Sequence, residues 1–105
     1  MPQARAGEVW IVDLGMVAKV RPCLLLTDYP RDDELALITI LAHTNTLKGN
    51  RWEHPCPKPF LKEGAFQLQQ IHSVPVVKLM RKLGDLRADE LETIRQKLRQ
   101  RLSLT

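Results

Sequence analysis

Side chains that could act on a phosphate group stand at the ends of two apolar segments of the sequence. Arg21 precedes a proline where a polar loop meets an apolar run, and its guanidinium is a permanently charged fork that matches phosphate oxygens. His43, Thr44 and Asn45 follow a second apolar run, and such hydroxyl and amide groups can hold a phosphate. From spacing alone the less specific interpretations are favoured: a surface ion pair for Arg21, and hydrogen bonds within a turn for the other three residues.

Other polar and aromatic residues offer weaker signals for nucleic-acid binding. Gln69 and Gln70 could read base edges, or they could form the exposed face of an edge strand. Trp10 and Trp52 could stack on bases. Trp10 lies inside an apolar run, however, so a core position is the favoured interpretation for it.

The motifs of metal and nucleotide-cofactor enzymes do not occur in the sequence. There is no glycine-rich phosphate loop, no His-Glu-x-x-His, no Cys-x-x-Cys and no Gly-x-Ser-x-Gly pattern. Cys23 and Cys56 are too few for a disulfide framework and lack the close pairing of a zinc site. We therefore expect no metal and no cofactor, and two reduced cysteines, Cys23 in the core and Cys56 in a loop.

The length and the charge distribution bound the possible partners. The 105 residues predict a single domain over residues 1–105, and 44% hydrophobic with 27% charged residues is ordinary for a globular protein. The formal net charge of +4 comes entirely from residues 76–105, which hold eight Lys/Arg against four Asp/Glu. This excess fits a polyanionic partner, and fits equally a solvated helix whose basic end complements its own dipole.

No membrane or export segment is expected. The sequence contains nothing near the ~18 consecutive apolar residues of a membrane-spanning helix. The first seven residues lack the apolar core of a signal peptide and lead directly into a strand-like run. The expected location is the cytoplasm, without membrane contact.

Short apolar runs separated by turn residues predict a mainly β domain that ends in a helix. Strands are expected over residues 8–14, 23–27, 35–41, 51–53, 64–72 and 81–86, with one helical turn over 76–79. From Ala88 the period changes to that of an amphipathic helix. Its expected apolar stripe consists of Leu91, Ile94, Leu98 and Leu102. Strands this short and close favour a curled or barrel-like sheet over an alternating α/β fold.

Five segments resemble, in their order along the chain, the sequence pattern of the PemK/MazF toxins. They are residues 7–14, 19–26, 40–44, 69–74 and 83–86, and the second contains the Arg21–Pro22 pair. The resemblance implies an SH3-like barrel of the CcdB/PemK/MazF type with a terminal helix. It also implies a homodimer that is neutralised by a small antitoxin protein.

The same resemblance implies a reaction and two active-site residues. Family members are metal-independent endoribonucleases (mRNA interferases) in which the 2′-hydroxyl of single-stranded RNA attacks the adjacent phosphate. Matched residue by residue, the family's active-site arginine and threonine correspond to Arg21 and Thr44. Arg21 would stabilise the negative charge that develops around phosphorus, and Thr44 would hold a phosphate oxygen.

Further residues are expected to contact the RNA, namely Lys19, His43, Asn45 and Gln70. Arginine is a poor general base because its pKa lies above ~12, whereas histidine titrates near neutral pH. His43 is therefore the better candidate for the proton carrier, although the family pattern does not require it.

One departure from the family pattern concerns the loop between the first two strands. Many members carry a longer loop with a Gly-x-Glu segment, whereas here only residues 15–20 separate Leu14 from Arg21, with no acidic residue among them. Two alternatives to a nuclease remain. One is a non-catalytic, CcdB-like toxin of the same fold that binds a protein target, and the other is a nucleic-acid-binding barrel without activity.

Overall fold

Six strands and one helix make up the computed structural model, which describes residues 4–15 and 19–104. The strands are β1 (Glu8–Asp13), β2 (Val20–Leu25), β3 (Leu37–Thr44), β4 (Glu53–His54), β5 (Ala65–Pro75) and β6 (Leu79–Asp85). A 3₁₀ turn, η1 (Val76–Lys78), joins β5 to β6, and the helix α1 (Ala88–Arg101) follows. The expected mainly β domain with a C-terminal helix is confirmed.

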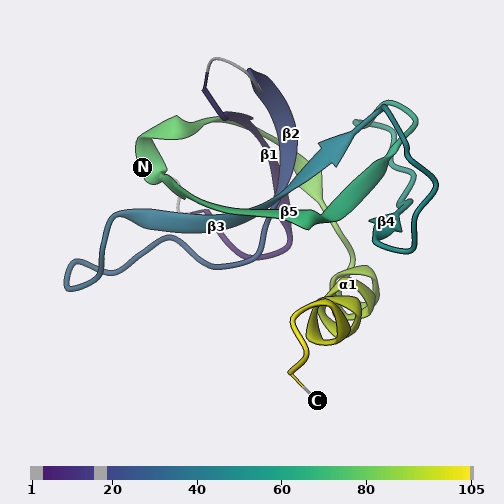
Figure 1. The fold of residues 1–105 in the computed structure, drawn as a ribbon. Coiled ribbons are helices and arrows are strands. Elements are labelled where there is room, and N and C mark those ends of the chain that lie inside the picture. Colours follow the sequence, from purple (N-terminus) through teal and green to yellow (C-terminus); the bar gives the residue numbers. More distant parts are fainter. Residues whose placement is uncertain (1–3, 16–18, 105) are drawn as a thin grey trace.

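All six strands belong to one antiparallel sheet in the order β4-β5-β3-β2-β1-β6. The sheet is strongly curled, and α1 lies beneath it (Figure 1). Within the described residues β4 and β6, at the two ends of this order, are not hydrogen-bonded to each other. The expected SH3-like barrel is therefore present as a curled sheet that stays open along these two edges.

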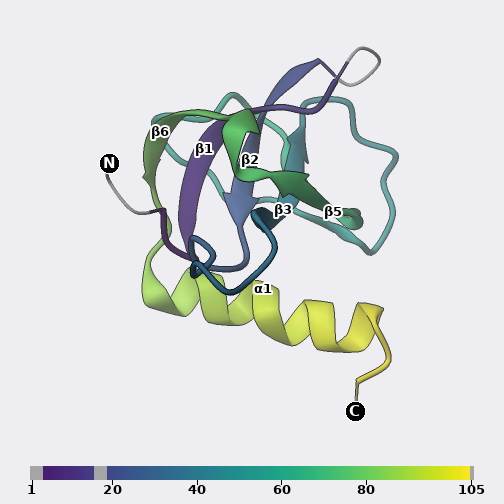
Figure 2. The ribbon, with the colours of Figure 1, turned by 90° about the vertical axis from the view of Figure 1, so that its left-hand side faces the viewer.

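Alternation of side chains along the strands builds two hydrophobic clusters, because successive residues of a strand point to opposite faces of the sheet. Leu24 and Leu41 are paired across β2 and β3, and they share a buried cluster with Ile94 of α1. Cys23 and Ala42, also paired, join the second cluster instead. Figure 2 shows α1 running beneath the ends of the strands. The core position expected for Cys23 is confirmed.

Charges at both ends of α1 complement its dipole. The first turn carries Asp89 and Glu90, and the last turn carries Arg99 and Arg101. Glu90 Oε1 also accepts a hydrogen bond from the backbone N–H of Arg87 (2.8 Å), which satisfies a donor at the helix start. The helix has 14 residues, and no helix in the described part of the chain is long and apolar enough to cross a membrane.

Two expectations about apolar side chains need correction. The helical spacing predicts Leu102 in the apolar stripe, but α1 ends at Arg101 and Leu102 is 52% exposed. Trp10 is half-buried rather than fully in the core. Its ring packs against the second cluster, and its indole Nε1 donates a hydrogen bond to Glu8 Oε1 (2.9 Å). A polar atom on a large ring keeps one end of that ring near the surface.

Strand pairing extends β3 and β5 beyond the predicted boundaries. β3 continues through His43 to Thr44, residues whose polar character predicted a loop, because both pair with the start of β5. β5 runs to Pro75, where its ladder with β3 ends at Leu37. The register of this ladder shifts between Leu41 and His43, so β5 bends at this point.

The segment between β4 and β5 is fastened to β6 by a close contact between Phe60 and Gly84. A Cβ atom on Gly84 would lie 2.4 Å from Cε2 of Phe60, far inside van der Waals contact. The ring of Phe60 therefore packs directly on the β6 backbone, and only glycine at position 84 leaves room for it.

Gly84→Ala is expected to lower the free energy of unfolding by about 1–3 kcal/mol, because the added methyl group overpacks this contact or expels the Phe60 ring. Denaturant titration followed by circular dichroism measures the change. Met80→Ala, on the same strand, is the control, since Met80 is 57% exposed. A Gly84→Ala protein as stable as the wild type would show that the contact contributes nothing.

A hydrogen bond of 2.9 Å between Lys97 Nζ and His54 Nδ1 ties β4 to α1. An ammonium group can only donate, so Nδ1 of His54 accepts and the ring is neutral, with its proton on Nε2. Burial, and secondly the charge of Lys97, lower the pKa of His54 below its ordinary value of 6.5. Protonation of His54 therefore opposes folding.

The free energy of unfolding is expected to decrease as the pH falls below ~6.5, because the unfolded chain binds a proton there while the folded His54 stays neutral until a lower pH. Lys97→Met is expected to raise the pKa of His54 and weaken this dependence. NMR titration of the His54 ring protons measures the pKa, with Arg99→Met on the same helix as the control. An unchanged His54 pKa in Lys97→Met would contradict the assignment.

Candidate functional site

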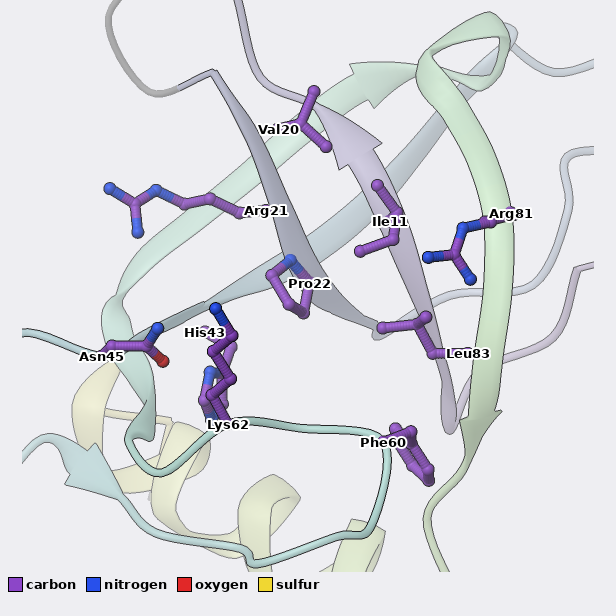
Figure 3. A pocket seen from close by; sticks show the side chains of 10 residues that line it. All are labelled: Ile11, Val20, Arg21, Pro22, His43, Asn45, Phe60, Lys62, Arg81 and Leu83. Carbon is purple, nitrogen blue, oxygen red and sulfur yellow. The ribbon is translucent and has the colours of Figure 1, made fainter.

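A cavity of about 350 Å³ opens where β1, β2, β3 and β6 meet the segment between β4 and β5 (Figure 3). Its apolar lining consists of Ile11, Val20, Pro22, Phe60 and Leu83. Its polar lining consists of Arg21, His43, Asn45, Lys62 and Arg81. The cavity thus draws on residues from five separate parts of the chain.

Strand register explains how two distant arginines reach one cavity. Ile11 of β1 pairs with Pro22 of β2 on one side and with Arg81 of β6 on the other. Arg21 is the neighbour of Pro22 and pairs with Val12, so its side chain leaves β2 on the other face, and in Figure 3 it points away from Arg81. Neighbouring antiparallel strands lie only ~5 Å apart, so the backbones of β2 and β6 are about two strand steps apart here, and the two arginines border the cavity from opposite sides.

The electrostatic character of the cavity is cationic. Arg21, Lys62 and Arg81 line it, and among the residues that the structure describes no carboxylate does. Within residues 4–15 and 19–104, none of the three forms an ion pair with an acidic side chain within 4.0 Å. Cations that are not neutralised by the protein favour an anionic ligand, and guanidinium groups match phosphate oxygens in particular.

His43 forms part of the cavity wall and is only 3% exposed. Its ring meets the edge of Phe66 at 5.0 Å between centroids. Burial lowers the pKa of His43 below its ordinary value, so the imidazole is neutral at pH 7. Gly64 covers it: a Cβ there would lie 3.0 Å from His43 Cε1 and 2.1 Å from the Thr44 carbonyl oxygen.

Thr44 is not part of the cavity lining, although the residues on either side of it are. Its hydroxyl accepts a hydrogen bond from the Thr46 N–H (3.1 Å) and donates one to the Thr46 carbonyl (3.3 Å). This is the turn interaction that spacing alone favoured for the cluster. The ladder of β2 and β3 ends at Cys23 and Ala42, so Arg21 and Thr44 lie beyond the paired residues of these two strands.

Two further expected residues, Lys19 and Gln70, do not line the cavity. Lys19 is exposed and precedes Val20 of the lining. Its φ is 58°, and its own N–H donates a hydrogen bond to the Gly15 carbonyl oxygen (2.6 Å). Gln70 is exposed near the bend of β5. Residues 16–18 of the short loop lie outside the described residues, so the expected effect of this loop on RNA capture stays a prediction.

Two cationic residues of the lining, Lys62 and Arg81, are not among those predicted from the sequence. Arg81 stands in a segment predicted as a strand, two residues before Leu83, and this alternation would have placed both side chains on one face. Lys62 carries no such signal, because it lies between Pro59 and Gly64, in a segment without helical or strand periodicity.

The whole cavity lies within a stretch that matches a known family. The model of the family described as "PemK-like, MazF-like toxin of type II toxin-antitoxin system" matches residues 5–102. The chain belongs to this family. The match includes every strand, α1 and all residues that line the cavity of this MazF-like protein. No single curated protein matches the chain by sequence.

Several solved structures share the fold. An endoribonuclease from mycobacterial species, in complex with its cognate antitoxin, has a TM-score of 0.80 at 20% identity, over 100% of this chain and 98% of that one. A MazE–MazF structure from Deinococcus radiodurans has a TM-score of 0.80 at 21% identity, over 99% and 100%. The Mycobacterium tuberculosis toxin MazF-mt6 has 0.72 at 24% identity, over 91% and 96%. At these identities the likeness establishes the shared fold.

Lys62→Gln and Arg81→Gln are each expected to weaken binding of a single-stranded oligonucleotide and to reduce the slope of log affinity against log salt by about 0.7–1, because each removes one phosphate contact. Fluorescence anisotropy over a range of salt concentrations measures both quantities. Arg31→Gln is the control, since Arg31 is exposed in the turn between β2 and β3. Equal slopes for all four proteins would argue against phosphate binding in the cavity.

Proposed function

We propose that this MazF-like protein is an endoribonuclease that cleaves single-stranded RNA at the cationic cavity without a metal ion. The supporting observation is that Arg21, Lys62 and Arg81 all line one cavity and that no carboxylate of the described residues lines it. A polyanion is the ligand that such a surface selects. A relative of the same fold is an endoribonuclease, which favours RNA cleavage over binding alone.

In the proposed reaction, the 2′-oxygen of a ribose bonds to the adjacent phosphorus while the bond from phosphorus to the 5′-oxygen breaks. The products are a 2′,3′-cyclic phosphate and a 5′-hydroxyl. Negative charge grows on the phosphate oxygens in the pentavalent transition state, and the Arg21 guanidinium stabilises it more strongly there than in the ground state. Lys62 and Arg81 hold the phosphate chain in place.

His43 is the proposed proton carrier. Its ring lines the cavity and is neutral at pH 7, because burial lowers its pKa, so it can accept the proton of the 2′-hydroxyl. The same ring then returns a proton to the departing 5′-oxygen. Thr44 holds a phosphate oxygen by turning its hydroxyl hydrogen away from the Thr46 carbonyl, to which it donates at 3.3 Å.

The remaining RNA contacts and the protein partners are part of the same proposal. Asn45 contacts RNA within the cavity, and Lys19 and Gln70 contact it outside. An antitoxin protein binds this toxin, as in the complexes of two relatives, and an acidic segment of that partner suits the exposed Arg95 and Arg99 of α1.

The chain forms a homodimer, and a sedimentation mass of 12.1 kDa, that of one chain, would contradict this.

Arg21→Ala is expected to lower the rate of RNA cleavage by about 10²–10³, because it removes a charge that stabilises the transition state. Arg21→Lys is expected to recover only part of the loss, since lysine lacks the two-pronged donor geometry. Cleavage of a fluorescent single-stranded RNA in the presence of EDTA measures the rates. Arg31→Ala is the control for a lost surface arginine.

Two results would overturn this mechanism: full activity in Arg21→Ala, or activity of the wild type that disappears in EDTA. RNA binding that falls with salt, but without cut products, would instead identify a nucleic-acid-binding protein without activity. A Thr44→Val protein that cleaves as fast as the wild type would remove Thr44 from the mechanism alone.

A further inference from the structure

Two cations of α1 lie against β4 and the residue before it. Lys97 Nζ is hydrogen-bonded to His54 Nδ1 (2.9 Å), and the Arg101 guanidinium carbon lies 5.5 Å from the centroid of the Trp52 ring. Lys97 and Arg101 are four residues apart, so they share one face of the helix. The last turns of α1 therefore pass this segment in the opposite direction and present two positive charges beside it.

A third cation lies over the same indole ring. The guanidinium carbon of Arg51 is 4.5 Å from the centroid of Trp52, and the Trp52 ring also packs against the first hydrophobic cluster. An indole attracts cations through its electron-rich face, so one anchored ring holds two guanidinium groups near each other. We call the three cations Arg51, Lys97 and Arg101 the β4–α1 surface.

No carboxylate among the described residues neutralises the β4–α1 surface. None of its three cations lies within 4.0 Å of an acidic side chain. His54, which accepts the hydrogen bond of Lys97, is neutral. Glu53 of β4 is occupied elsewhere, because its carboxylate accepts the backbone N–H groups of Lys48 (2.6 Å) and Gly49 (2.8 Å).

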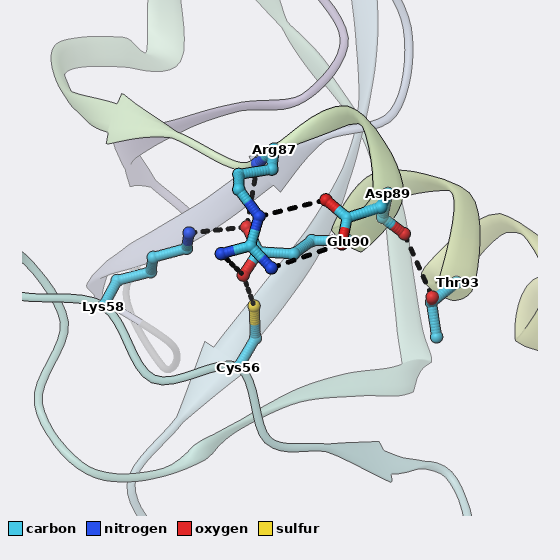
Figure 4. Close-up of polar contacts among 6 residues, drawn as sticks. All are labelled: Cys56, Lys58, Arg87, Asp89, Glu90 and Thr93. Carbon is cyan, nitrogen blue, oxygen red and sulfur yellow. Dashed lines mark hydrogen bonds and ion pairs between the residues drawn. The ribbon is translucent and has the colours of Figure 1, made fainter.

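The cations near the start of α1, in contrast, are neutralised (Figure 4). Glu90 pairs with Lys58 and Arg87, and Asp89 accepts a hydrogen bond from Arg87 Nε (3.0 Å). Glu90 also accepts a hydrogen bond from the Cys56 thiol (3.7 Å), so this carboxylate fixes the segment between β4 and β5 to the helix. These cations serve the fold, whereas those of the β4–α1 surface can bind an external anion.

The segment 55–64 connects the β4–α1 surface with the cleavage cavity. It follows His54 directly and forms most of the wall of a second cavity of about 360 Å³, which begins at Pro55. This second cavity adjoins the cleavage cavity, because both have His43 and Lys62 in their walls. Its charged lining has a net positive charge and consists of Lys58, Lys62 and Glu63.

We infer that the β4–α1 surface binds phosphates of the RNA strand outside the cleaved nucleotides. This inference rests on the proposed RNA cleavage. A strand that extends beyond the cavity carries one negative charge per nucleotide, and guanidinium groups bind such phosphates without reading the sequence. An acidic peptide would meet the same cations, but the connection to the cleavage cavity through the segment 55–64 favours RNA.

The test compares RNAs with short and long flanks around one cleavage site, which is first mapped on a longer transcript. Stacked nucleotides advance about 3.4 Å each, so about twelve of them exceed the longest dimension of the chain, 38 Å. Synthetic RNAs therefore carry the site with about three or about twelve nucleotides on each side. The wild type is expected to have a KM about tenfold lower for the long RNA at equal kcat, because remote contacts bind ground state and transition state alike.

Arg51→Gln/Arg101→Gln is expected to raise the KM of the long RNA about tenfold, to that of the short RNA, because two phosphate contacts are lost. The kcat and the KM of the short RNA are expected to stay unchanged. Arg5→Gln/Arg31→Gln is the matched control, since it removes the same charge at two exposed residues outside both cavities. It is expected to keep the tenfold difference between the two RNAs.

Circular dichroism verifies the fold of both double variants. If Arg51→Gln/Arg101→Gln loses helix, Arg51→Glu replaces it, because it reverses one charge at an exposed residue and leaves α1 intact. This variant is expected to raise the KM of the long RNA by about threefold or more.

Equal KM values of the two RNAs in the wild type, or a tenfold difference that persists in the β4–α1 variant, would overturn the inference and leave the nuclease proposal standing. Unchanged RNA kinetics together with weaker binding of a fluorescent decaglutamate peptide would assign the surface to an acidic protein, and would also overturn it. A wild type that cleaves no RNA would remove both proposals.

Discussion

Both cavities depend on how closely the segment 55–64 approaches the end of β3. A Cβ atom on Gly64 would lie 2.1 Å from the Thr44 carbonyl oxygen, so only glycine lets the two backbones meet there. This approach covers the His43 ring, removes it from water and lowers its pKa. It also carries Lys62 to the wall that separates the two cavities. The burial of the His43 imidazole and the position of Lys62 in the cavity wall both follow from the contact between Gly64 and the Thr44 carbonyl.

The acidic and basic side chains have separate tasks in this fold. Glu53 accepts backbone N–H groups of the turn before β4, and Glu90 anchors the cavity wall to α1. Arginines and lysines at the cavity, in contrast, have no acidic partner within the described residues. A carboxylate beside them would neutralise the field that attracts a phosphate chain. The balanced charge of residues 1–75 therefore conceals two cations of the site, Arg21 and Lys62, and the third, Arg81, belongs to the basic residues 76–105.

Sequence patterns were informative wherever a local rule applied. Runs of β-branched, aromatic and other apolar residues located β1 and most of β2, and the helical spacing of Leu91, Ile94 and Leu98 located α1. The rules failed where a neighbour decided the outcome. His43 and Thr44 read as loop residues, yet pairing with β5 extends the strand through them. Leu102 continues the helical spacing, yet α1 ends one residue before it.

The sequence by itself determined the element types, the two-sided patterning of the strands and the family pattern that singles out Arg21 and Thr44. Only the tertiary structure decided that Arg81 and Lys62 join Arg21 at one cavity, and that the Thr44 hydroxyl faces its own turn. The reason is physical: periodicity records which face a side chain occupies within its own element. Which elements meet depends on sheet register and on close backbone contacts between segments far apart in the chain.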